Sequence, residues 1–554
     1  MAGLLNTAAR PDTASLLQAA ARVVSYAAVR LFLAVFLAAT ASLAMEAREK
    51  RNWGTLSGSL ESNSIYYMHD AGLDPSSSVN PDDRFGTNNY LKLDYMNGRF
   101  SAGLQMEGFL PALQGYDYLV YGNGRKVILG SKYVSWQDDM YGFRVGDIFE
   151  QYGNGLIFRS YEDRALGFNN SLEGVHGRFD WKGVHLSAMF GRPRLYLEYA
   201  ESMVRGADLC LSLSEMTGWD AASLSIEGSY VNRYENLMEN ELFADLLTTN
   251  SLDMYSARAN FDWKGLSAKF EYAGKSKDLP DAASREMLTG NAILAELGYS
   301  YRRFSVLGTF RRLVNMNTMI SLNAAGTGNT LNYLPALTRQ HTYMLASLNP
   351  YQVNANGEIG GQADVYYSLR SKTTRSKYWN FHVNFSTYYT DASHTGGRSN
   401  LLWRDINADV ERQWNKRWKT AVLVSIQEWS PSHGMQESTY ASNIFVVDNT
   451  CKITDKMSVR LELQYLYSAN YEKDWMAGLL EFNMAPHWSV TISDMYNHGS
   501  SGKHYYNASV SYTRKSTRIQ LGYGRVRAGY ICSGGVCRWT PAYTGANLTI
   551  TSSF

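Results

Sequence analysis

The chain ends in the stretch Ala542 to Phe554, which reads Ala-Tyr-Thr-Gly-Ala-Asn-Leu-Thr-Ile-Thr-Ser-Ser-Phe. Its apolar side chains are assigned to one face of a strand: Tyr543, Leu548, Ile550 and Phe554. Its polar side chains are assigned to the other: Asn547, Thr549, Thr551 and Ser553. Side chains of a strand point alternately to its two faces, so this pattern predicts a strand with one apolar and one wet face. The chain is therefore expected to end inside a β-sheet, on an aromatic residue.

The same alternation recurs throughout the chain after Trp53. Val459 and Leu461, for example, alternate with Arg460 and Glu462. A period of two with charges on the second face means that this face is wet. A water-soluble sandwich would also alternate, but it would bury its apolar face against a second sheet and would not need such uniform strand lengths.

The connections between these strands favour a barrel. Short turns are predicted at residues 97–98, 138–139, 182–183, 264–265, 302–303, 415–417, 454–455, 486–487 and 515–516. Long connections are predicted around residues 70–87, 109–126, 150–172, 192–206, 234–251, 276–289, 313–358, 390–399, 430–437, 468–474, 497–503 and 527–540. Short and long connections alternate, as in barrels with tight periplasmic turns and longer extracellular loops. We predict an all-β fold, a single large transmembrane antiparallel β-barrel of about 24 strands, within a range of about 20 to 26.

The amino-terminal segment has the features of a secretory signal peptide. The apolar run Leu31 to Ala39 follows Arg30 and leads into small residues up to Ala44. This run is well short of the roughly 20 apolar residues that a membrane-spanning helix needs. We predict a signal peptide over residues 1–44 and the barrel over residues 45–554. The thirty residues before the run are more than the positively charged region of a usual signal peptide contains, so the position of the start codon stays undecided.

Tryptophan placement is consistent with two membrane boundaries. Nine tryptophans fall near the short turns or the first strand: Trp53, Trp136, Trp181, Trp219, Trp263, Trp379, Trp414, Trp418 and Trp488. Four fall at strand ends near the long connections: Trp403, Trp429, Trp475 and Trp539. Because indole prefers the membrane–water boundary, we predict an aromatic girdle at each end of the barrel. The alternative is that tryptophan merely brackets turns.

Taken together, these features resemble Gram-negative outer-membrane β-barrel proteins along the whole mature chain. The size, the 39 tyrosines and the terminal aromatic residue suggest an uncharacterised family of the Bacteroidota type. The resemblance implies a location in outer-membrane lipid. It also implies insertion by the barrel assembly machinery, which in this class reads the final strand, so Phe554 is the expected assembly signal.

Two long segments are candidates to block the lumen of so wide a barrel. The first, residues 146–177, carries Arg159, Glu162, Asp163 and Arg164, which we propose as a constriction if the loop turns inward. The alternative is a solvated external loop held by its own ion pairs. The second, residues 313–358, is nearly uncharged; it is expected to plug or cap the barrel, to add a strand pair, or to lie outside as a mobile loop.

Little in the sequence points to catalysis or to metal. Cys532 and Cys537 are expected to close a small disulfide loop, since no second Cys or His pair with metal-ligand spacing lies nearby. The ten histidines are scattered and form no HExxH motif, and there is no GxSxG motif, so we expect no enzyme activity and no cofactor. The net charge of +2 gives no reason to invoke nucleic acid.

Two functions remain open. In the first, the barrel is a passive channel for small solutes with a loop-constricted lumen. Its wall would then carry charges of both signs: Lys92, Asp94, Glu107, Glu227, Arg460, Glu462 and Arg518. Because strands are predicted to begin near Trp53, we expect no amino-terminal plug, which would disfavour energy-coupled uptake. In the second, the barrel is a non-enzymatic scaffold subunit of an outer-membrane secretion, assembly or lipoprotein complex, with envelope proteins or lipoproteins as partners.

Overall fold

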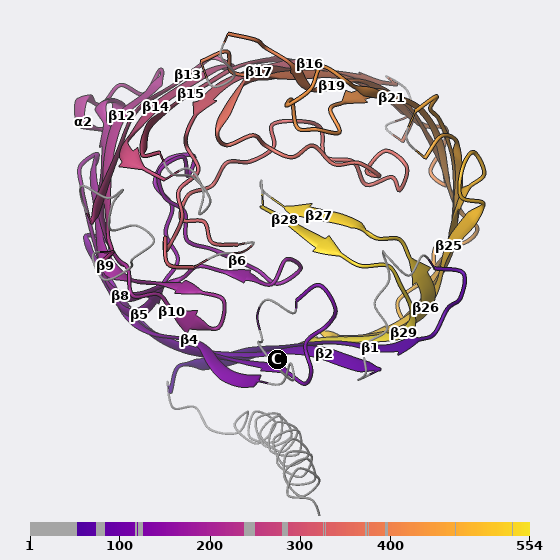
Figure 1. The fold of residues 1–554 in the computed structure, drawn as a ribbon, viewed down its shortest axis with the longest axis horizontal. Coiled ribbons are helices and arrows are strands. Elements are labelled where there is room, and N and C mark those ends of the chain that lie inside the picture. Colours follow the sequence, from indigo (N-terminus) through magenta and orange to yellow (C-terminus); the bar gives the residue numbers. More distant parts are fainter. Residues whose placement is uncertain are drawn as a thin grey trace, which may run out of the picture.

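The chain forms one closed ring of antiparallel strands, seen down the barrel axis in Figure 1, in a computed structural model. The structure describes residues 53–73, 84–116, 119, 126–237, 250–279, 286–324, 326, 328–371, 374, 376–393, 397–470, 472–533 and 536–554. The barrel has 24 strands, as predicted, and the last strand pairs with the first to close it. Residues 1–44, the expected signal peptide, lie outside the described residues.

The barrel strands have the following bounds: β1 (Thr55–Met68), β2 (Phe85–Asn97), β3 (Phe100–Phe109), β4 (Lys126–Gln137), β5 (Tyr141–Ile148), β8 (Leu172–Trp181), β9 (Val184–Leu195), β11 (Met203–Ser212), β12 (Ser223–Tyr234), β13 (Ser251–Trp263), β14 (Leu266–Asp278), β15 (Leu288–Tyr301), β16 (Phe304–Val314), β17 (Gly357–Arg370), β18 (Tyr378–Thr390), β19 (Leu401–Gln413), β20 (Trp418–Trp429), β21 (Tyr440–Lys452), β22 (Met457–Tyr467), β23 (Trp475–Met484), β24 (Trp488–Asn497), β25 (Lys503–Arg514), β26 (Thr517–Val526) and β29 (Tyr543–Ser553). Shorter elements lie between them: β6 (Glu162–Asp163), β7 (Phe168–Asn169), β10 (Glu198–Tyr199), α2 (Leu213–Thr217), β27 (Gly529–Ser533) and β28 (Val536–Thr540). Among the described residues, no helix has the length and hydropathy needed to cross a membrane.

The carboxy-terminus lies at the seam of the barrel. Phe554 exchanges two backbone hydrogen bonds with Gly58 of β1: the Gly58 N–H donates to the Phe554 carbonyl at 2.8 Å, and the Phe554 N–H donates in return at 3.0 Å. A Cβ on Gly58 would lie 2.6 Å from the ring of Phe554, so glycine is what allows the ring to lie there. The last residue is therefore fixed at the seam by two backbone hydrogen bonds and by the space that Gly58 leaves for its ring.

One assignment in that last strand is wrong. Tyr543 packs edge-on against the inward-facing Tyr67, with ring centroids 5.4 Å apart, whereas Leu548 is exposed on the outer face. Leu548 is five positions after Tyr543, and a period of two places residues an odd number of positions apart on opposite faces. Tyr543 therefore belongs to the lumen.

The outer face of the ring is apolar along strand after strand. Large side chains at alternate positions are about half exposed, among them Val145, Phe190, Leu297, Phe445 and Ile492. A soluble protein rarely exposes so extensive an apolar surface, because each such side chain in water forgoes favourable burial. The surface is that of a barrel embedded in lipid, with its polar alternate positions turned to the lumen.

The turns lie where the sequence predicts them. All the predicted short turns connect strands at one end of the barrel, and the strand ends that the predicted long connections join lie at the other. At two of the short turns, Lys182 and Lys264 have φ angles of 45° and 44°, and each precedes a glycine with positive φ. Such residue pairs form the two-residue hairpins that match strand twist. Two further short-end connections, around α2 and between β17 and β18, are absent from the prediction.

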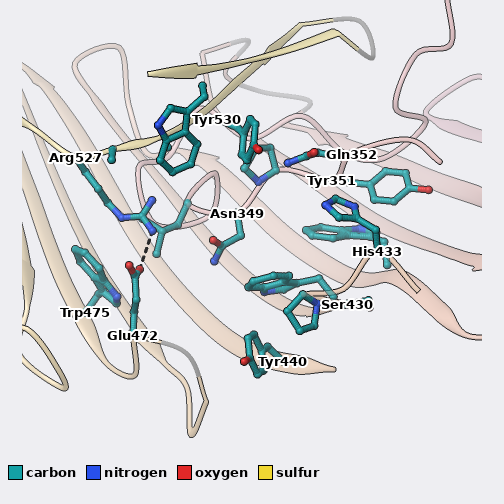
Figure 2. A pocket seen from close by; sticks show the side chains of 18 of the residues that line it. Asn349, Tyr351, Gln352, Ser430, His433, Tyr440, Glu472, Trp475, Arg527 and Tyr530 are labelled. Carbon is teal, nitrogen blue, oxygen red and sulfur yellow. Dashed lines mark hydrogen bonds and ion pairs between the residues drawn. The ribbon is translucent and has the colours of Figure 1, made fainter. Parts of the chain in front are cut away.

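The tryptophans form one girdle rather than two. At the short-turn end all but Trp379 are exposed, as a membrane boundary requires. At the long-loop end, Trp403 and Trp475 are only 4% and 1% exposed, because each shares the parity of an inward residue of its own strand, Asp405 on β19 and Ala477 on β23. Trp429 and Trp539 line one cavity inside the barrel mouth together with them. Figure 2 shows this cavity with Trp475 labelled. The predicted second girdle is therefore wrong.

Candidate functional site: a lumen filled by three inserts

Three long connections run inward from the long-loop end and occupy the lumen (Figure 1). We call residues 149–171, between β5 and β8, the first insert. Residues 315–356, between β16 and β17, form the second insert, and residues 527–542, between β26 and β29, form the third insert. The first contains β6 and β7, and the third contains the hairpin of β27 and β28.

Arg164 ties the first insert to the barrel wall. Its guanidinium pairs with Glu61 of β1 at 2.9 Å and with Glu162 at 3.4 Å, and donates to Gln105 of β3 at 2.9 Å. The guanidinium also lies over the ring of Tyr90, 4.7 Å from its centroid. Burial works against this charge, but the nearby carboxylates, Glu162 first, outweigh it and raise the pKa of Arg164. The arginine stays charged and holds the insert against the wall.

The other candidate constriction residues have separate roles. Asp163 stabilises the turn after β6 by accepting the Leu166 N–H. Arg159 contacts the second insert in two ways. Its guanidinium lies 3.8 Å from the centroid of the Tyr333 ring, and its backbone N–H donates to the Leu331 carbonyl at 3.1 Å. Glu162 and Arg164 lie together, whereas Arg159 belongs to a different contact. All four lie on an insert inside the barrel, but they do not form a single ring of charge.

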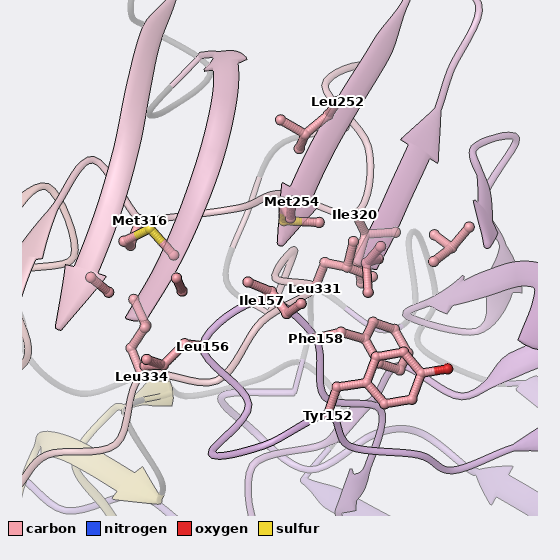
Figure 3. Close-up of a cluster of buried hydrophobic side chains, with 14 of the residues drawn as sticks. Tyr152, Leu156, Ile157, Phe158, Leu252, Met254, Met316, Ile320, Leu331 and Leu334 are labelled. Carbon is pink, nitrogen blue, oxygen red and sulfur yellow. The ribbon is translucent and has the colours of Figure 1, made fainter. Parts of the chain in front are cut away.

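The first and second inserts share an apolar core with one side of the wall (Figure 3). Leu156, Ile157 and Phe158 of the first insert are each 1% exposed or less, and they belong to the same cluster as Ile320 and Leu331 of the second. Inward-facing wall residues complete the cluster, among them Val204, Val231, Leu252, Met254, Ala273, Ala292 and Leu313. A packed cluster of this kind holds both inserts in place, because releasing them would expose all of these side chains to water.

The second insert then crosses toward the opposite wall (Figure 1). Leu345 and Ala346 are buried against inward residues of β20 to β23, and the Leu345 N–H donates to Gln464 Oε1 at 2.9 Å. Between these two contact regions lies the half-buried His341, whose two ring nitrogens are buried and have no hydrogen-bond partner among the described residues. Burial, and then the neighbouring charge of Arg339, lowers the pKa of His341 to about 4.

The third insert reaches the first across the lumen. Cys532 and Cys537 are joined by a disulfide within the β27–β28 hairpin. Arg538 of the same hairpin donates to the Ala165 carbonyl of the first insert at 3.2 Å, and its guanidinium lies 3.9 Å from the centroid of the Tyr116 ring. The first insert therefore contacts both of the others.

The charges of the wall are largely paired with each other. Lys92 lies 3.4 Å from Asp94, Glu107 lies 2.6 Å from Arg194, Glu227 lies 2.8 Å from Arg258, and Arg460 lies 2.5 Å from Glu462. Arg518 donates to Gln520 at 2.8 Å. Each predicted lumen charge thus has a neighbour that offsets or accepts it, so the wall has no long unpaired run of one sign at these positions. Among the described residues, no group of His, Cys, Asp and Glu could hold a metal ion.

The fold and the lumen together define a membrane-embedded β-barrel with an internally packed mouth. Residues 27–554 match the family described as "Family of unknown function (DUF6029)", and the chain belongs to that family. No curated protein matches the sequence.

Solved structures with a similar strand layout include other barrels. The translocation pore of the P pilus usher PapC has a TM-score of 0.43 at 9% identity, covering 90% of this chain and 99% of that one. The siderophore receptor PirA from Pseudomonas aeruginosa has a TM-score of 0.40 at 9% identity, covering 91% and 81%. A mutant Rh. blastica porin has a TM-score of 0.27 at 12% identity, covering 60% and 100%. At these identities the function of none of them transfers to this chain.

Proposed function

We propose that the protein is an outer-membrane channel through which small solutes diffuse passively, by the space that the three inserts leave in the lumen. The observation that carries the proposal is the buried core that the first and second inserts share with the wall, because it keeps both inserts inside the barrel. A barrel of this width has too few wall side chains to fill its own interior, so the inserts determine what passes.

The proposal includes the route to the membrane and the absence of chemistry. A signal peptide over residues 1–44 directs export, and the barrel assembly machinery reads the final strand at Phe554. The short turns then face the periplasm and the inserts enter from outside. The protein acts without catalysis or a cofactor, and its wall, with paired charges of both signs, gives little preference between cations and anions.

Planar bilayers test this proposal. The purified full-length protein should insert in discrete steps of small conductance, with similar permeability to potassium and chloride. Reversal potentials in a salt gradient measure that preference, and a variant with Glu227 and Arg258 both replaced by Gln should shift it only slightly. A membrane that stays silent at modest voltage after verified insertion would overturn the channel.

The same packed inserts support a second candidate, a scaffold subunit of an outer-membrane secretion, assembly or lipoprotein complex. If the core leaves no continuous path, the barrel is closed and its mouth is a surface for a partner. This candidate predicts co-purification with other envelope proteins or lipoproteins in mild detergent. Recovery as a free monomer together with measurable conductance would count against it and for the channel.

A further inference from the structure

The four inward tryptophans converge on one cavity of about 650 Å³ at the barrel mouth. They come from four separate elements: Trp403 from β19, Trp429 from β20, Trp475 from β23 and Trp539 from β28. The volume lies in the range of roughly 300 to 1,000 Å³ that is usual for small-molecule sites. A membrane girdle does not explain these residues, because they face the interior.

The cavity has a wall, a floor and a cover made by different parts of the chain. Residues of β19, β20, β21, β23 and β25 form the wall, and residues 348–352 of the second insert form the floor. The β27–β28 hairpin brings Tyr530, labelled in Figure 2, and Trp539 to the other side of the cavity. Their ring centroids are 5.0 Å apart and the rings meet edge to face at 72°. Both are nearly half exposed, so their ring faces are open to a ligand.

The floor is held in place before any ligand arrives. The hydroxyl of Tyr351 donates to Glu358 at 2.5 Å, and Glu358 is itself paired with the fully buried Arg311 at 2.5 Å. The ring of Tyr351 lies 5.8 Å from that of Trp403. A ligand would therefore meet an aromatic surface that costs little to order on binding.

Planar polar groups lie among the aromatic rings. Arg527 and Glu472 pair at 2.8 Å across the cavity edge, and Asn349 and Gln352 come from the floor (Figure 2). Lys503 adds a cation that has no ion-pair partner among the described residues. A purely apolar ligand would desolvate the Arg527–Glu472 pair and Lys503 and offer them no new partner, which disfavours a lipid chain. A cation is disfavoured too, because the cavity has two cationic side chains against one carboxylate.

We propose that this cavity binds a short oligosaccharide. A sugar ring has a face of C–H groups that packs flat on indole and phenol rings, and hydroxyls at its edge that pair with amide, carboxylate and guanidinium groups. The inference names the class of solute that would meet the constriction and in that respect rests on the proposed channel, although binding itself can be measured without conductance.

Equilibrium binding to the full-length protein in detergent tests it. The probes are maltotetraose, cellotetraose and tetragalacturonate, followed by titration calorimetry and by the change in tryptophan fluorescence. At least one probe should bind with a Kd below about 1 mM. Trp429→Ala and Trp539→Ala should each weaken that binding about tenfold, the loss expected when a stacked aromatic face is removed.

The matched control is Trp263→Ala, which removes an exposed tryptophan of the short-turn girdle and should leave the Kd within about twofold. Trp539 is on an exposed hairpin, so its variant stays informative if Trp429→Ala fails to fold. No binding of any probe at about 10 mM, or binding by both cavity variants as tight as that of the wild type, would overturn the inference. Binding without conductance would overturn only the channel, and conductance without binding only the oligosaccharide.

Discussion

The two sides of the lumen differ in what the second insert does there. Against β9 to β16 its first part packs with the first insert into an apolar core. On the opposite side Leu345 and Ala346 pack on the wall, and the residues that follow border a tryptophan-lined cavity that stays open. One connection thus serves as filling on one side and as a floor on the other. The inserts therefore do more than block the barrel, because they also determine where open space remains in the lumen.

The largest effect is expected where the two sides join. Arg311 and Glu358 are both fully buried, and Arg311 also donates to the Pro335 carbonyl, so the pair fixes the second insert on either side of its crossing. Arg311→Ala leaves Glu358 buried and unpaired, which should cost about 3–5 kcal/mol. Thermal unfolding by circular dichroism and protease sensitivity of the insert measure the loss.

The control for that variant is the exposed pair of Arg398 and Glu437, whose side chains are 80% and 78% exposed at 3.9 Å. Arg398→Ala should change stability by less than about 1 kcal/mol. Equal effects of the two substitutions would mean that the Arg311–Glu358 pair does not anchor the second insert.

The packed side should be sensitive to cavity creation. Ile157→Ala removes a fully buried side chain from the shared core and should destabilise the docked inserts by about 2–5 kcal/mol. Leu348→Ala, at the cavity floor, removes a side chain that is only partly buried and should cost clearly less. Hydrogen exchange of residues 149–171 and 315–356 separates the two. A larger loss from Leu348→Ala would invert the comparison of the two sides.

Acid should loosen the second insert between its two contact regions. The pKa of His341 is about 4 when docked and about 6.5 when exposed, so the released state binds more protons between these values. The contribution of the neutral imidazole to docking is therefore full above pH 6.5 and is lost as pH falls through 4. Proteolysis of the insert should rise over that window in the wild type and stay flatter in His341→Gln. Identical pH profiles would exclude His341 as the cause.

The smallest effect on stability is expected at the cover of the cavity. Trp539 is 49% exposed, so Trp539→Ala should change the free energy of unfolding by no more than about 1 kcal/mol while it weakens ligand binding. Chemical denaturation monitored by the remaining tryptophans checks this. A loss of several kcal/mol would show that the hairpin is structural packing and not a cover over open space.

Alternation and turn chemistry predicted the barrel because both are local. The alternation of neighbouring residues is enough to assign Leu461 and Glu462 to opposite faces of their strand. The hairpin turn at Lys264-Gly265 is specified by these two residues alone. The second girdle failed although the signal was present: Trp403 has the same parity as Asp405, Asn407 and Asp409, which marks an inward face. Position at a strand end predicts a girdle residue, whereas the parity of Trp403 predicts an inward side chain, and the parity is correct.

The filled lumen could be predicted only in part. The mixed charges of the first insert predict that it turns into the lumen. Its contact partners are not predictable in this way, because Arg159 contacts Tyr333, which is 174 positions away, and no local pattern contains that pairing. The cavity is harder still to predict, because it exists only after the second and third inserts meet residues of five barrel strands. Contacts between distant loops depend on the closed barrel, which is a property of the whole chain.

The most direct test of the central claim is the unit conductance of the wild type beside a variant in which residues 150–170 are replaced by a short Gly-Ser linker. If the inserts set the passage, removing the first one should raise the conductance several-fold and increase current noise from the freed second insert. The same conductance in both proteins, with the variant correctly folded and inserted, would contradict the account.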